Sequence, residues 1–332
     1  MRSKQKKPKK MVTDKTSEYD PAEKKMIMAD IEKLWKTYSD YRIEYSESGR
    51  PKYIDPRTIP VGGFDPLDKP KDGCLSITCY GKRRTGKSFW IDWYCYTRHC
   101  HHFDAVYVFT NTKNSMHNGY EKAIEDVFIF SFDTSILNSI HKQAEEYLAE
   151  HGHPQNILII MDDLAGDDDV RYNKFVKALY TRGRHHGYTI IFSTQRPTGI
   201  PPIVRTNTDT AVIFNQLAKD DMDVIANTYL SRLNFRTAME LITLYTQDNT
   251  ALIVELWRNN FIKPDEYLKV MKAFEPRKYR MMCCEKYHED AEKERQRRQL
   301  AKKGQNTHSK PPDPDYSKQN LTLYQMKGFK PF

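Results

Sequence analysis

Short, unbroken runs of apolar residues recur through the middle of the chain, and longer amphipathic segments separate them. The runs predict strands over 75–80, 105–109, 127–130, 157–161, 189–193 and 210–214. The segments between and after them predict helices over 87–100, 134–150, 170–183 and 219–230. Because the runs do not alternate with polar residues, we expect a sheet that is covered on both faces. The pattern therefore predicts an α/β fold with a mainly parallel sheet and helices on both faces.

The flanks of this region have different patterns. Residues 251–256 predict a further strand that would extend the sheet at an edge, and residues 264–274 predict a helix. Apolar residues at helical spacing predict a helical arm from Asp20 to about Tyr41, and Ser46 to Gly73 predict a linker or an extended wrapping segment. We therefore expect four regions. Residues 1–18 would form a disordered basic arm, and residues 19–73 an N-terminal helix with its linker. Residues 74–260 would form the core, and residues 261–332 the C-terminal helices with a basic, partly disordered tail.

Composition and charge narrow the class of protein. An apolar content of 39% allows a real core, although a mean hydropathy of -0.77 indicates that much of the chain is solvated. The net charge of +9 favours an anionic partner such as nucleic acid. The six cysteines show no disulfide-scaffold spacing, so we expect reduced thiols. No apolar stretch approaches the roughly 20 residues needed to cross a bilayer, so we expect no membrane span.

A glycine-rich loop follows the first predicted strand of the core. Residues 81–88 read GKRRTGKS, which matches G-x-x-x-x-G-K-[ST] between a strand and a helix. Such glycines let backbone N–H groups turn inward around an anion, and the helix N-terminus adds partial positive charge. Lys87 would reach the β- and γ-phosphates and Ser88 would bind Mg²⁺, whereas the alternative is a purely structural turn. We predict ATP and Mg²⁺ as cofactors, with the nucleotide held by Gly81, Arg84, Thr85, Gly86, Lys87 and Ser88.

Two carboxylates end the fourth apolar run. Asp162 and Asp163 follow Ile157–Met161, which places them at the carboxyl edge of a parallel sheet, where ligands bind. We expect Asp162 to hold Mg²⁺, together with Ser88, and Asp163 to act as the general base. The alternative for Asp163 is a structural cap of the next turn. The acidic run at 167–169 fits a solvated loop better than a second metal site.

Polar and basic residues near the fifth run complete the predicted chemistry. Gln195 lies two positions after the run over 189–193, where it would reach the γ-phosphate or the attacking water. Arg184 lies before that run and would act across a subunit interface as an arginine finger. Arg182 and Arg205 are rivals for the same role. The predicted catalytic residues are therefore Asp163, Gln195 and Arg184.

The four segments GKRRTGKS, ILIIMDD, GRHHG and FSTQRP together resemble the genome-packaging ATPases of large DNA viruses, of the poxvirus type, in the FtsK–HerA class of P-loop ATPases. The resemblance covers residues 75–215. It implies a P-loop NTPase fold of the ASCE or RecA-like kind, a homo-oligomeric ring of five or six subunits, and movement of double-stranded DNA at the expense of ATP. The wider class usually has Glu where this chain has Asp163, although viral relatives also carry the Asp pair. By position, the resemblance gives the roles above to Lys87, Ser88, Asp162, Asp163, Gln195 and Arg184.

The sequence thus predicts an ATPase that translocates DNA and packages a viral genome, with hydrolysis completed between subunits. Capsid or portal-type proteins are the expected partners besides double-stranded DNA. The interior of a host cell (cytoplasm, viral factory or nucleus) is the expected location, with carriage in the virion as an alternative. The rival functions are a P-loop kinase of a nucleotide or small molecule, a translocase or helicase not involved in packaging, and a nucleotide-gated scaffold without catalysis.

Overall fold

The computed structural model describes residues 46–98, 102–111, 119–164, 170, 173–216, 218–258, 263–272, 276, 278–281, 289, 291–293, 295–297 and 299. A division of the chain after Glu44 leaves every described residue in the second unit. The predicted basic arm, the helix from Asp20 to about Tyr41, the acidic run at 167–169 and the end of the tail lie outside the described residues.

One sheet of nine strands organises the described part of the chain. Its order is β1-β9-β8-β7-β2-β6-β5-β3-β4, and pairing is parallel from β7 through β4, while β8 is antiparallel to both β7 and β9. The predicted mainly parallel sheet is therefore confirmed. The strands are β1 (Gly62–Gly63), β2 (Ser76–Tyr80), β3 (Ala105–Thr110), β4 (Ile129–Phe130), β5 (Ile157–Asp162), β6 (Tyr188–Thr194), β7 (Thr210–Ile213), β8 (Thr250–Glu255) and β9 (Leu268–Lys272).

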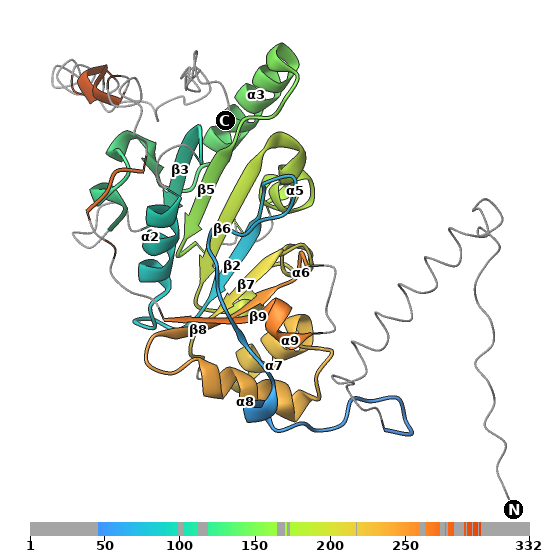
Figure 1. Cartoon of the computed structure of the whole chain (residues 1–332). Coiled ribbons are helices and arrows are strands. Elements are labelled where there is room, and N and C mark those ends of the chain that lie inside the picture. Colours follow the sequence, from blue (N-terminus) through green and yellow to red (C-terminus); the bar gives the residue numbers. More distant parts are fainter. Residues whose placement is uncertain are drawn as a thin grey trace, which may run out of the picture. The chain divides into compact units, whose positions relative to one another are not determined.

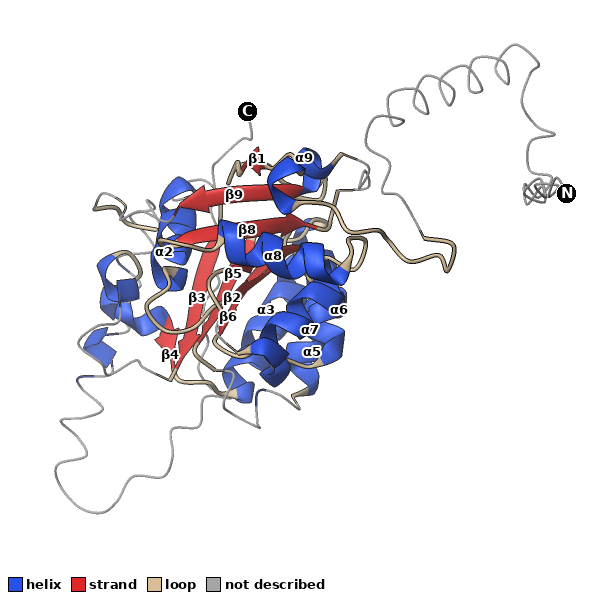
Figure 2. Ribbon diagram, turned by 90° about the horizontal axis from the view of Figure 1, so that it is seen from below, coloured by secondary structure: helices blue, strands red, loops and turns tan. Residues whose placement is uncertain are grey.

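Helices cover both faces of this sheet, as predicted. Figure 2 shows α2 on one face and α3, α5, α6 and α7 on the other. For α2, α3, α5 and α6, which connect parallel strands, these sides are the ones that right-handed crossovers require. No helix in the described part of the chain is both long and apolar enough to cross a membrane. The α-helices are α2 (Lys87–Thr97), α3 (Thr134–His151), α5 (Lys174–Arg182), α6 (Pro202–Thr206), α7 (Lys219–Tyr229), α8 (Phe235–Tyr245) and α9 (Pro264–Tyr267).

The central strands are buried along their whole length. Every residue of β2, β3, β6 and β7 is buried, and so is every residue of β5 except its last, Asp162. Burial on both faces explains why β3 and β5 read as nearly unbroken apolar runs, whereas β2 also contains the buried polar residues Ser76 and Thr78. Some polar groups inside the core pair with one another, as where the Tyr80 and Tyr229 hydroxyls lie 2.5 Å apart.

The register of the strands places three loops at one edge. Tyr80 of β2 pairs with Thr194 of β6, and Ser193 of β6 pairs with Asp162 of β5. All three strands are parallel, so their carboxyl ends coincide and the chain leaves each of them at the same edge (Figure 1). Strand β6 is inserted between β2 and β5, so whatever follows β6 lies between the loops that follow its two neighbours.

The segment before β2 is extended and wraps the core. Ile54 exchanges two hydrogen bonds with the Thr237 hydroxyl on α8, at 3.0 and 2.9 Å. Further along, the Pro66 carbonyl accepts a hydrogen bond from Arg98, just after α2, and Asp68 pairs with Arg258. Of the two interpretations of residues 46–73, these contacts fit a wrapping segment.

Two predictions for the region after β7 are wrong, one helix there was not predicted, and one predicted strand earlier in the chain is too long. The helix predicted over 264–274 ends at Tyr267, and Leu268–Lys272 form β9, because β8 leaves unpaired backbone groups that β9 satisfies. For the same reason β8 is not an edge strand. Helix α8 was not predicted, although the Asn234 side chain caps it by accepting a hydrogen bond from the Arg236 amide and the helix buries Leu241 and Ile242. Residues 127 and 128, predicted as strand, belong to a 3-10 turn, η5 (Asp126–Phe128), that precedes β4.

Candidate nucleotide-binding and catalytic site

The loop between β2 and α2 has the backbone conformation of an anion cradle. Arg84 has φ +64° and Gly86, at the N-cap of α2, has φ +105°, so both are left-handed. At Gly81 a Cβ atom would come within 2.7 Å of Phe214 and of the Thr85 hydroxyl, so glycine is required there for close packing. This geometry supports the predicted phosphate loop, whose N–H groups gather at the start of α2.

Lys87, at the first position of α2, folds back over the loop. Its Nζ donates hydrogen bonds to the Gly81 carbonyl at 2.5 Å and to the Lys82 carbonyl at 2.9 Å. Burial lowers the pKa of Lys87, while the nearby carboxylate of Asp162 raises it in part. The side chain is thus a partly desolvated cation held inside the loop, where a phosphate would replace its carbonyl partners.

Asp162 is the last residue of β5 and is partly buried at the carboxyl edge. Its Oδ2 atom accepts a hydrogen bond from the Tyr120 hydroxyl at 2.9 Å. Burial raises the pKa of Asp162, and the hydrogen bonds from Ser193 and Tyr120 work in the opposite direction. These partners orient the carboxylate.

Asp163 is exposed and has φ +55°, an uncommon conformation for a residue other than glycine. Its Oδ1 atom accepts a hydrogen bond from Nε2 of Gln195 at 2.9 Å. The left-handed turn directs Asp163 away from the strand and toward the residue that follows β6. The structure therefore brings together two of the predicted catalytic residues, which lie 32 positions apart in the sequence.

The donor set at this edge suits Mg²⁺. Ser88 is exposed in the first turn of α2, and Asp162 offers a carboxylate oxygen from the neighbouring loop. Mg²⁺ in phosphate-binding sites takes oxygen ligands from one or two protein groups and from the substrate phosphates. Ser88 and Asp162 are the two residues that would hold it.

The predicted arginines do not join this group within one subunit. Arg184 is exposed in η6 (Gly183–His186), which precedes β6, and Arg182 ends α5. Both lie at the amino end of β6, the opposite end from Gln195. Arg205 is partly buried, and its Nη1 donates to the Pro197 and Ile200 carbonyls at 3.0 and 2.5 Å, so it holds its own loop together.

Tyr120 is the site residue that the sequence does not reveal. It lies in the 3-10 turn η4 (Gly119–Lys122), is 8% exposed, and reaches Asp162 across 42 positions. No motif surrounds it. Ser193 was also missed as a partner of Asp162, although it belongs to the predicted strand and its register opposite Asp162 follows from parallel pairing.

Replacing Tyr120 with phenylalanine is expected to lower the apparent affinity for Mg²⁺ in ATP hydrolysis about 10-fold, because groups that orient a metal ligand typically contribute 10–100-fold. The measurement is the rate of hydrolysis against Mg²⁺ concentration at saturating ATP. The matched control is Tyr94→Phe, since the buried Tyr94 hydroxyl has no hydrogen-bond partner among the described residues. Equal Mg²⁺ dependence in both variants would contradict this role for Tyr120.

Comparison with known proteins identifies relatives of this chain. It is 28% identical over 188 residues to protein 075L of Invertebrate iridescent virus 6, which covers 55% of this chain and 71% of the relative. It is 26% identical over 147 residues to protein 015R of Frog virus 3, which covers 43% of this chain and 45% of that relative. The chain thus spans less than half the length of the second relative.

Solved structures with a similar arrangement are also known. The genome packaging NTPase B204 from Sulfolobus turreted icosahedral virus 2, in complex with AMPPCP, aligns with a TM-score of 0.43 and 14% identity, over 61% of this chain and 99% of that one. The pCW3 conjugation coupling protein TcpA aligns with a TM-score of 0.41 and 14% identity, over 73% and 81%. The strand order and the phosphate loop of this chain, rather than these similarities, carry the assignment of its fold.

A family model described as Poxvirus A32 protein matches residues 73–255. The match includes the phosphate loop, both aspartates, Gln195 and the strands that position them, and it confirms the resemblance that the motifs indicated. Because it spans more than half of the 332 residues, the chain belongs to the Poxvirus A32 protein family and is a P-loop ATPase.

Proposed function

We propose that this protein is an ATP-driven motor that moves double-stranded DNA during the packaging of a viral genome, and that its subunits complete hydrolysis across their interfaces in a ring. The observation that carries the proposal is the hydrogen bond between Asp163 and Gln195 at the same sheet edge as the phosphate loop. A nucleotide-gated scaffold without catalysis would not need a base and a γ-phosphate sensor in contact.

The chain's own groups have distinct tasks in this reaction. The loop from Gly81 to Gly86 binds the phosphates, and Lys87 exchanges its two carbonyl partners for phosphate oxygens. Ser88 and Asp162 would hold Mg²⁺, which would supply positive charge to the bound phosphates. Asp163 accepts the proton of the attacking water as the water oxygen bonds to the γ-phosphorus and the bond to the bridging oxygen breaks. Gln195 holds Asp163 and orients the water.

The position of the arginines supports catalysis between subunits. Strand β6 has seven residues, so it separates Gln195 from the turn of Arg184 by about 23 Å at roughly 3.3 Å per residue. Arg184 therefore does not serve its own site. In a head-to-tail ring, two different surfaces of the subunit meet, and the surface with Arg184 would face the phosphate loop of the neighbour.

Exposed apolar side chains lie on both of these surfaces. Phe89, beside the phosphate loop, is 52% exposed, and Ile203, which shares a groove with Arg182, is 42% exposed. Large exposed apolar groups are common at sites of association, and two different ones fit a head-to-tail contact. The motif resemblance supports double-stranded DNA and capsid or portal-type proteins as partners. The net charge of +9 gives further support to DNA.

The test is the rate of ATP hydrolysis by the purified chain against duplex length and salt concentration, with oligomer size measured in parallel. We expect duplex DNA to stimulate hydrolysis, the stimulation to fall steeply with salt because phosphate contacts release counterions, and activity to follow the oligomer. A phosphorylated small molecule as product would indicate the kinase alternative. If duplex DNA of any length leaves the rate of ATP hydrolysis unchanged at low salt, the proposal of a DNA motor is wrong.

A further inference from the structure

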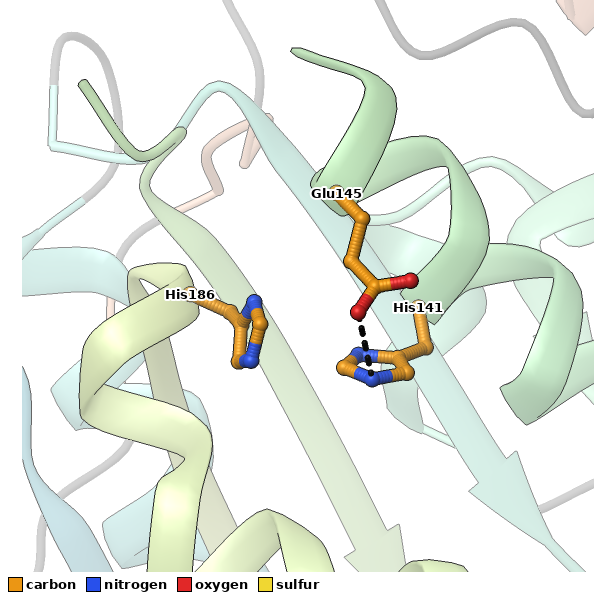
Figure 3. A group of neighbouring side chains, drawn as sticks. All are labelled: His141, Glu145 and His186. Atoms are coloured by element: carbon orange, nitrogen blue, oxygen red, sulfur yellow. Dashed lines mark ion pairs between the residues drawn. The ribbon is translucent and has the colours of Figure 1, made fainter. Parts of the chain in front are cut away.

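A cluster of two histidines and one glutamate lies away from the nucleotide site. Figure 3 shows His141 and Glu145, from α3, and His186, from η6, with their side chains pointing toward one another. In the part of the chain that the structure describes, these three bring ligand atoms within 4.8 Å of each other. The cluster lies at the amino end of β6, whereas Asp163 and Gln195 lie at the carboxyl edge.

We propose that His141, Glu145 and His186 form a binding site for a zinc-class divalent metal ion that joins α3 to the turn before β6. Two imidazoles and one carboxylate are the ligands of a three-residue zinc site, with water in the fourth position. The nitrogen ligands argue against Mg²⁺ and Ca²⁺, which prefer oxygen. The proposal stands apart from the nucleotide site and does not depend on the proposed function.

The distances require only a small adjustment. Nε2 of His141 lies 3.6 Å from Oε1 of Glu145, on adjacent turns of one helix. Ligand atoms around a tetrahedral zinc ion lie roughly 3.3 Å apart, given metal–ligand bonds of about 2.0–2.2 Å. The separation of 4.8 Å therefore has to shrink by about 1.5 Å at most, which rotation of exposed or half-buried side chains can supply.

The second nitrogen of His141 has the partner that a ligand histidine usually has. Its Nδ1 lies 3.1 Å from the hydroxyl of Tyr188, the first residue of β6. Such a contact fixes the ring orientation and leaves Nε2 for the metal. Tyr188 is 2% exposed, so this support belongs to the core and not to the mobile surface.

His186 carries an unmet bonding requirement. Its Nδ1 is buried and has no hydrogen-bond partner among the described residues. No described protein group satisfies this nitrogen, and a metal ion bound at Nδ1 would do so.

The groove around the cluster limits which ion fits. It has a volume of about 590 Å³, and Lys174, Lys177 and Arg182 also line it. With these cations nearby and one carboxylate in the cluster, an ion held by charge alone would bind poorly. Zinc-class ions form strong bonds to neutral imidazole, so they are the class that this site selects.

The experiment titrates the full-length protein with Zn²⁺ by calorimetry after treatment with a chelator, and repeats it with Co²⁺ as a spectroscopic probe. We expect His186→Gln and Glu145→Gln each to weaken one class of site at least about 100-fold, since even outer partners contribute 10–100-fold. The matched controls are His185→Gln and Glu146→Gln, which alter exposed neighbours of the same type.

A second measurement separates this cluster from the cysteines of the chain. Zn²⁺ should raise the thermal midpoint of the wild type and of both controls, but not that of His186→Gln, because binding to the folded state stabilises it. The Co²⁺ spectrum should lack thiolate charge-transfer bands. Equal zinc affinity in all five proteins, or a thiolate spectrum, would overturn the proposal. The cluster would then consist only of the His141–Glu145 ion pair and the contact between the two histidine rings. ATP binding by each variant shows separately that the nucleotide site is intact.

Discussion

Asp163→Asn is expected to lower kcat for ATP hydrolysis about 100- to 10,000-fold, the usual contribution of a general base, while ATP affinity stays close to that of the wild type. The substitution is selective because asparagine keeps the Oδ1 atom that accepts the hydrogen bond from Gln195. It removes the charge and the capacity to accept a proton, and little else. Single-turnover hydrolysis and nucleotide binding, measured on the same preparation, separate the two effects.

The control for this variant is Asp163→Glu, which keeps the carboxylate and matches the residue usual in the wider class. We expect it to retain most of the activity. If Asp163→Asn hydrolyses ATP at the wild-type rate, Asp163 only shapes the turn, and another group must activate the water. A loss of ATP affinity as large as the loss of kcat would point to a folding defect in the loop.

Arg184→Ala is expected to lower kcat about 1,000-fold or more, because arginine fingers contribute about 10³–10⁵. Its own phosphate loop should remain intact, since η6 lies at the other end of β6. Arg182→Ala, on the same surface, is the comparison that separates Arg184 from its rival for this role. Arg205→Ala should instead lower stability, because the Arg205 side chain donates to the Pro197 and Ile200 carbonyls.

Mixing the two inactive variants tests whether Arg184 acts across the interface. A ring that contains Arg184→Ala and Asp163→Asn subunits in equal numbers should rebuild a complete site at about a quarter of its interfaces, where an intact acid meets an intact arginine. Recovery of hydrolysis on mixing is the expected result. No recovery, in rings shown to be mixed by their mass, would count against Arg184 in this role.

The central strands could be predicted because the burial of each one is visible in its own short stretch of sequence. Strands β5 and β6 are buried on both faces, so each appears in the sequence as an unbroken apolar run. Strand β9 could not be predicted in this way, because Leu268–Lys272 contains two lysines and is only partly buried, and its conformation comes from pairing with β8. Helix α8 was missed because Phe235 and Leu244 are exposed and blur its apolar face.

The same distinction applies to the candidate site. Asp162, Asp163 and Gln195 were predicted because each follows an apolar strand, and parallel strands end together. Tyr120 reaches Asp162 across 42 positions, a proximity that only the folded chain creates. The contact between Asp163 and Gln195 is intermediate: the sequence placed both at one edge, but the hydrogen bond also depends on the left-handed turn at Asp163.

Strand β6 has a mechanical consequence for a ring of such subunits. It is a close-packed strand with Gln195, the proposed γ-phosphate sensor, after one end, and Arg184, the proposed arginine finger, before the other. A buried strand cannot absorb a displacement along its length, so a shift at Gln195 would move the turn of Arg184 as well. Loss of the γ-phosphate from one site would then change the position of the arginine at the adjacent site, and the subunits of a ring would hydrolyse ATP in sequence.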